Sequence, residues 1–138
     1  PYARGMFAIE RMAVRGNEHE FRQAAGSSVH YVDGGVDSGP IIRTVRLIEP
    51  FGYESISALK AAIYQLDFKL LEAVALDFIE TSHGTSAALP AGVVPDPRLR
   101  GPAFAASKFT PELRRQAHEN YAAMKASTAS ANAGKSLS

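Results

Sequence analysis

The chain has 138 residues, 46% of them hydrophobic and 21% charged, and its 15 basic residues nearly balance 14 acidic ones to leave a formal net charge of +1. This length fits one ordinary domain with a single core, and the balanced charge excludes the strong positive field by which proteins attract nucleic acid or an anionic membrane. The sequence contains no cysteine, which excludes disulfides and thiolate metal sites and fits a reducing cytoplasm, and no apolar run is long enough to span a bilayer.

The first half of the chain predicts a short helix followed by two strands. Apolar residues within 6–14 recur at helical spacing, and Gly16 is a typical residue for a helix end. The segments 29–32 and 41–48 are rich in β-branched residues, so we expect each to form a strand. The residues between the two strands, 33–40, then form a connecting loop.

The second half predicts two helices separated by an irregular extension. Apolar residues recur every three or four positions over 56–78, which indicates one long amphipathic helix with Ser55 as its N-cap. Frequent glycine and proline after this helix favour a connector or a surface wrap. Thr110 followed by Pro111 is typical of a helix start, and we expect the last helix to run to about Lys125.

The loop between the two predicted strands carries the side chains best suited to chemistry, His30, Asp33 and Asp37. A carboxylate beside an imidazole can relay a proton or stabilise a cation. Gly34 and Gly35 leave the backbone able to approach a planar, hydrogen-bonding ligand. On these residues alone the alternative stays open that Asp and Gly serve only the turn of a hairpin.

The sequence does not predict a metal site. A metal on His30, Asp33 and Asp37 is disfavoured because no second histidine lies nearby. His83 and His118 are isolated in the sequence, which is more typical of surface or capping roles.

The run 29–42, which reads VHYVDGGVDSGPII, closely resembles the signature segment of the formyltetrahydrofolate-dependent formyltransferases of the phosphoribosylglycinamide type. The resemblance extends upstream to Pro1 and downstream to about Glu80. It implies an α/β fold, namely the C-terminal part of a Rossmann-like formyltransferase domain with a mixed sheet and flanking helices. It also implies a cytoplasmic enzyme of one-carbon metabolism that uses 10-formyltetrahydrofolate as formyl donor and needs no metal.

The resemblance implies a role for individual residues of the loop. Asp37 matches the catalytic aspartate, which helps to move a proton as an amine attacks the formyl carbon. His30 matches the strand histidine that supports this aspartate. Five residues match the loop whose backbone holds the pterin end of the folate: Val32, Asp33, Gly34, Gly35 and Val36.

Two departures from the family pattern concern the acceptor and the rest of the active site. Enzymes acting on glycinamide ribonucleotide carry a Glu-His pair in the long helix, where this chain offers Asp67 as a weaker substitute and no histidine. This weakens glycinamide ribonucleotide as the acceptor and leaves another amine, such as an amino sugar or an amino acid, open. The family's catalytic Asn-x-His-Pro element would fall before Pro1, together with the N-terminal half of the fold. The letters Asn-x-His at 17–19 follow the first helix, and we expect them to be a solvated loop.

Three functions follow as expectations: formyl transfer to a primary amine, hydrolysis of formyltetrahydrofolate, and non-catalytic binding of a folate or nucleotide. The expected partners are a small amine, the missing N-terminal half and a second copy in a homo-oligomer, with no nucleic acid and no membrane. We assign 1–84 to the catalytic domain and 85–125 to the extension with the last helix. The Ala- and Ser-rich tail 126–138 has too little apolar bulk to order itself.

Overall fold

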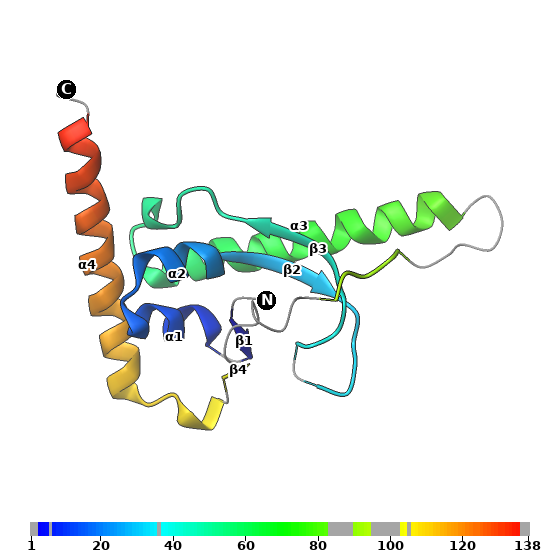
Figure 1. The fold of residues 1–138 in the computed structure, drawn as a ribbon, viewed down its shortest axis with the longest axis horizontal. Coiled ribbons are helices and arrows are strands. Elements are labelled where there is room, and N and C mark those ends of the chain that lie inside the picture. The colour runs from blue at the N-terminus through cyan, green and yellow to red at the C-terminus, as the bar shows by residue number, and fades with distance from the viewer. Residues whose placement is uncertain are drawn as a thin grey trace.

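A computed structural model describes residues 3–5, 7–35, 37–82, 90–94, 103–104 and 106–135 of the chain. Helices and strands are mixed in it (Figure 1). The described strands form two separate two-stranded sheets, one antiparallel (β2 with β3) and one parallel (β1 with β4). In chain order the elements are β1 (Arg4–Gly5), α1 (Ala8–Arg15), α2 (Glu18–Ala24), β2 (Gly26–His30), β3 (Ile41–Arg46), η1 (Pro50–Gly52), α3 (Ile56–Ser82), β4 (Ala103–Phe104), η3 (Ala106–Lys108) and α4 (Pro111–Lys135).

Two short helices, α1 and α2, meet at a tight break. Gly16 adopts a left-handed backbone conformation with φ of 67° and ends α1, which confirms the predicted helix end. The Oδ1 atom of Asn17 accepts a hydrogen bond from the backbone N–H of Glu20 at 3.0 Å and so caps α2. The prediction of a solvated loop at 17–19 is therefore wrong. The cap and the burial of Phe21 stabilise a helix that is otherwise polar.

The antiparallel ribbon of β2 and β3 differs in its ends from the predicted strands. The first strand lies further upstream than the predicted range 29–32: it begins at Gly26 and ends at His30. A Cβ atom on Gly26 would lie 2.3 Å from the carbonyl oxygen of Val45, so only glycine allows the two backbones to approach here. The second strand ends at Arg46, before its predicted end, and the Ile48 side chain after it is almost fully exposed.

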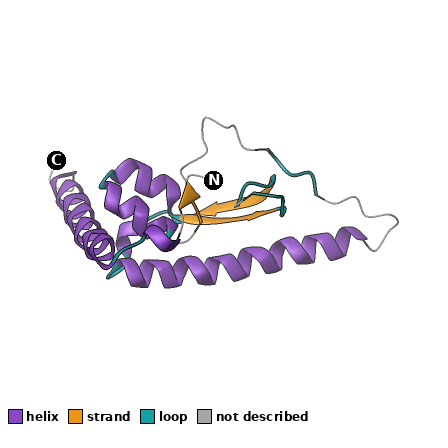
Figure 2. Cartoon of the chain, turned by 90° about the horizontal axis from the view of Figure 1, so that it is seen from below, coloured by secondary structure: helices purple, strands orange, loops and turns teal. Residues whose placement is uncertain are grey.

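The long helix α3 packs along one side of the ribbon and projects beyond it (Figure 2). The Oγ atom of Ser55 accepts a hydrogen bond from the N–H of Ala58 at 3.2 Å, which confirms the predicted N-cap. Near the other end of the helix, Asp77 pairs with Arg43 of β3 at 2.5 Å. The helix buries four apolar side chains: Ile56, Leu59, Leu70 and Val74.

The main core lies at one end of the molecule, where α1, α2, η1 and the start of α3 meet α4. Three rings form its centre, with centroids 5.4 Å apart for Phe21 and Phe51 and 5.8 Å apart from each of these to Tyr121. Around them lie the other buried residues of this cluster: Met12, Ala13, Ile56, Leu59, Ala117 and Met124.

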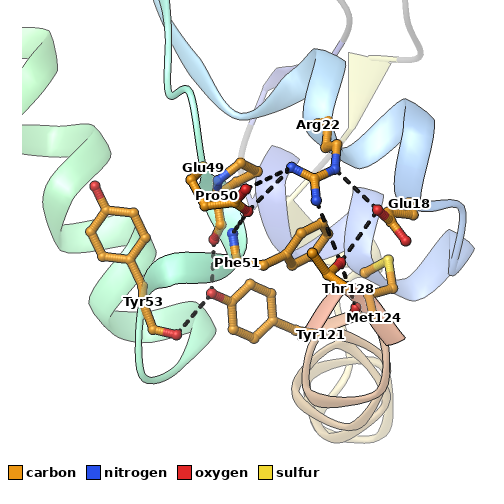
Figure 3. Close-up of polar contacts among 9 residues, drawn as sticks. All are labelled: Glu18, Arg22, Glu49, Pro50, Phe51, Tyr53, Tyr121, Met124 and Thr128. Carbon is orange, nitrogen blue, oxygen red and sulfur yellow. Dashed lines mark hydrogen bonds and ion pairs between the residues drawn. The ribbon is translucent and has the colours of Figure 1, made fainter. Parts of the chain in front are cut away.

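The last helix, α4, begins as predicted but is longer. The Oγ1 atom of Thr110 accepts a hydrogen bond from the N–H of Leu113 at 3.2 Å. The helix continues to Lys135, so most of the tail expected to lack order is helical. Alanine favours a helix, and the Arg22 guanidinium donates to Thr128 Oγ1 at 3.4 Å, which holds this part of α4 against α2 (Figure 3).

Candidate functional site

The structure brings His30 and Asp37 together at the loop that joins β2 to β3. The Nε2 atom of His30 lies 3.7 Å from Oδ1 of Asp37, and the Asp37 side chain is 49% exposed. The Nδ1 atom of His30 lies 2.9 Å from the carbonyl oxygen of Tyr31 and donates a hydrogen bond to it, because a carbonyl oxygen can only accept. This bond orients the ring so that Nε2 faces the carboxylate, and the two groups form an ion pair when the imidazole is protonated.

Asp37 holds an unusual backbone conformation. Its φ of 47° lies in the left-handed region, which costs free energy for a residue with a side chain, although aspartate tolerates it better than most. Strained residues of this kind are frequent at ligand-binding and catalytic sites. The conformation turns the chain so that Asp37 can face back toward the strand that ends in His30.

Asp33 holds the loop together from within. Its Oδ1 atom accepts hydrogen bonds from the backbone N–H of Gly35 at 2.9 Å and from the hydroxyl of Ser38 at 2.5 Å. A Cβ atom on Gly35 would lie 2.1 Å from that hydroxyl oxygen, whereas nothing lies within 4 Å of the place of a Cβ on Gly34. The loop is therefore closed on the side of Gly35 and open at Gly34.

The remaining predicted site residues lie apart from this pair or beyond the description. The Val32 side chain is exposed on the loop. Val36 lies outside the described residues. Asp67 lies on α3, a different element from the loop, and its side chain is half-buried, so its role in acceptor binding stays a prediction.

A segment that the sequence analysis did not connect to the loop packs against its base. We call residues 90–94 the strap. The Tyr31 hydroxyl donates to the carbonyl oxygen of Pro90 at 2.5 Å. Ile41 and Val93 exchange two backbone hydrogen bonds, both of 2.8 Å. The strap therefore fixes the residues on both sides of the loop, the one after His30 and the first of β3.

Glycine makes this close contact possible. A Cβ atom on Gly92 would lie 2.5 Å from Cβ of Pro40 and 3.0 Å from the ring of Tyr31. At the loop itself, a Cβ on Gly39 would lie 1.7 Å from the carbonyl oxygen of Tyr31. The pair Val93-Val94 amid prolines was the one sequence signal for a strand-like contact here.

Within the described ranges, no three His, Asp or Glu side chains lie close enough to hold a metal ion. None of the helices in those ranges is both long enough and apolar enough to cross a bilayer. Comparison of the chain with protein-family models, with curated proteins and with solved structures finds no match.

Proposed function

We propose that this chain takes part in the transfer of a formyl group from 10-formyltetrahydrofolate to a primary amine. The observation that carries the proposal is the placement of His30 Nε2 3.7 Å from Asp37 Oδ1 across a loop held by the strap and by Asp33. It adds to the resemblance of the run 29–42 to the formyltransferase signature segment. A carboxylate and an imidazole so placed can take up and return a proton.

In the proposed reaction, the amine nitrogen attacks the formyl carbon and forms a new C–N bond. The bond between the formyl carbon and N10 of the folate then breaks, and its electron pair goes to N10. Asp37 accepts the proton that the amine loses, and this proton is returned to N10, so the carboxylate is regenerated. When its imidazole carries a proton on both nitrogens, His30 stabilises the Asp37 carboxylate between these steps, and the bond to Tyr31 already orients its ring.

The loop is the proposed folate-binding element. Its backbone around Gly34 is open to solvent, while Asp33 keeps the turn in shape, so N–H and C=O groups can meet the planar pterin. Donors for the oxyanion would come from the N-terminal half of a Rossmann-like fold. Asp67 is the proposed contact to the acceptor, which is glycinamide ribonucleotide, an amino sugar or an amino acid.

The test compares two substitutions of half-exposed aspartates in the complete protein. Asp37→Asn removes the proton acceptor, so we expect kcat to fall by about 10²–10⁴. The dissociation constant of the folate should change little, because the amide keeps the size of the side chain. Asp77→Asn, which alters the ion pair with Arg43 on α3 and β3 rather than the loop, should leave both quantities unchanged. Near-normal turnover of the Asp37 variant would refute the role of Asp37.

The exposure of Asp37 supports a second candidate, hydrolysis of formyltetrahydrofolate. A side chain that is 49% exposed is open to water, and water can replace the amine as nucleophile. Formate release in the absence of any amine, at the same rate as in its presence, would favour the hydrolase over the transferase. Folate binding without formate release or formyl transfer would favour a non-catalytic binding module.

A further inference from the structure

A hollow of about 270 Å³ is lined by residues of α1, α3 and α4 and by none of the β2–β3 loop. Charged and aromatic side chains from all three helices and the residue before α1 line it. Those used below are Phe7, Glu10, Lys60, Tyr64, Arg114 and His118. The hollow is smaller than the sites that take drug-sized ligands, which suits a small metabolite.

Glu10 supplies a buried acceptor with no donor. This residue is only 8% exposed. Its Oε1 atom accepts a hydrogen bond from Lys60 Nζ at 2.5 Å, but Oε2 has no hydrogen-bond partner among the described residues. A buried carboxylate oxygen without a donor is costly, so a bound group that brings an N–H would be stabilised here.

Arg114, which lines the hollow from α4, supplies a cation that has no carboxylate partner among the described residues. Its guanidinium lies 5.8 Å from the ring centroid of Phe7. His118 lies one turn further along α4 on the same side. By contrast, Arg115 already pairs with Glu112 and with Glu119.

We propose that this hollow binds a free amino acid with an apolar side chain. The ammonium group donates to Glu10 beside Lys60, and the carboxylate pairs with Arg114 and His118. The side chain packs against the rings of Phe7 and Tyr64. A zwitterion is the class of ligand that satisfies both the unpaired acceptor and the unpaired cation at once, and this site is independent of the formyl-transfer proposal.

The ligand side of the proposal is tested by titration calorimetry of the 138-residue chain with three related compounds. L-Leucine carries both charges, N-acetyl-L-leucine lacks the ammonium group, and 3-methylbutylamine lacks the carboxylate. We expect L-leucine to bind with one site per chain, and each of the other two to bind at least about tenfold more weakly, because each loses one charge-assisted hydrogen bond. Equal affinity for the three, or no binding of L-leucine up to about 10 mM, would overturn the proposal.

Three variants test which residue binds the ammonium group of the ligand and which binds its carboxylate. Glu10→Gln should abolish the preference for L-leucine over N-acetyl-L-leucine, and Arg114→Gln should abolish the preference over 3-methylbutylamine. Arg115→Gln changes the neighbouring arginine, which is already paired, and should leave all three affinities as they are. Arg114 is exposed, so its variant tests the site even if the Glu10 variant does not fold; unchanged selectivity in the Arg114 variant would contradict the assignment.

Discussion

Tyr121 joins two distant segments of the chain through one buried hydroxyl. It lies on α4 and donates to the carbonyl oxygens of Pro50 at 2.9 Å and Tyr53 at 3.2 Å (Figure 3). Burial raises the pKa of its phenol from 10.0 to about 12, because the charged form is poorly solvated there. The side chain therefore stays neutral in the folded state at a pH where it ionises in the unfolded state.

We expect Tyr121→Phe to lower the free energy of unfolding by about 1–3 kcal/mol at neutral pH, since the buried Pro50 carbonyl oxygen loses its donor, while the Tyr53 carbonyl oxygen keeps its bond from Lys125 Nζ. The stability that the raised pKa gives is complete below pH 10 and is lost as pH rises from 10 to about 12. The difference in free energy of unfolding between wild type and Tyr121→Phe should therefore decrease over this pH range, by at most about 2–3 kcal/mol. Urea unfolding followed by far-UV circular dichroism at several pH values measures it.

The matched control is Tyr64→Phe, because the Tyr64 side chain is largely exposed on α3. This variant should follow the wild type at every pH. If the difference in free energy of unfolding between wild type and Tyr121→Phe stays constant up to about pH 11, then Tyr121 is not the group whose ionisation lowers the stability at high pH.

At the scale of elements, the strap at 90–94 holds the base of the β2–β3 loop. We expect Gly92→Ala to push the strap away from the loop, because the new Cβ would lie 2.5 Å from Cβ of Pro40. Overpacking of this kind costs about 1–3 kcal/mol, so the amides of Ile41 and Val93 should exchange with solvent about 5- to 150-fold faster. Hydrogen exchange followed by NMR measures both amides.

Gly34→Ala is the control for this experiment, since nothing lies within 4 Å of the place of a Cβ on Gly34. Exchange at Ile41 and Val93 should then be unaltered. The core at the other end of the molecule should keep its stability in both variants. Unaltered exchange in the Gly92 variant would show that the strap does not hold the loop.

Local signals in the sequence account for the elements that were predicted well. Gly16, Ser55 and Thr110 act as helix caps through their own backbone or side chain, so short-range patterns suffice to find them. The helix α2 was missed because a single buried ring, Phe21, stabilises it, although Asn17 followed by Glu20 was a capping signal.

The candidate site was predicted only in part. A short loop between two strands allows His30 and Asp37 to pair, and the sequence predicted this pairing only as one possibility. The bond from Tyr31 to Pro90 joins residues 59 positions apart, and no local pattern encodes it. Bracing of the turn by Asp33 depends on the particular hydroxyl of Ser38 and was likewise not predicted.

At the scale of the whole molecule, α3 has one apolar side in the core and a second that is exposed. Leu59 is 0% exposed and Phe68 is 74% exposed on the same helix. We expect Leu59→Ala to lower the free energy of unfolding by about 2–5 kcal/mol, because it removes buried methyl groups and leaves a cavity. Phe68→Ala should change it by less than about 0.5 kcal/mol. Urea unfolding of both variants tests the difference.

A large loss of unfolding free energy in the Phe68→Ala variant would mean that this side of α3 is covered in solution. Sedimentation of the wild-type chain over a range of concentrations then separates the explanations. A loss that grows with protein concentration would indicate a second copy on this side, as expected for a homo-oligomer, while a loss independent of concentration would indicate cover from within the chain.

The packing of α4 against α1 and α2 has a consequence for folding during synthesis. Arg22 and Thr128 lie 106 positions apart, and the central rings Phe21 and Tyr121 are almost as distant in the sequence. Ribosomes add about 5–20 residues per second, so α1 and α2 wait at least about 5 s for the helix that completes their core. Their apolar side chains stay open to chaperones for that time, and the arrival of α4 is the late step that ends this exposure.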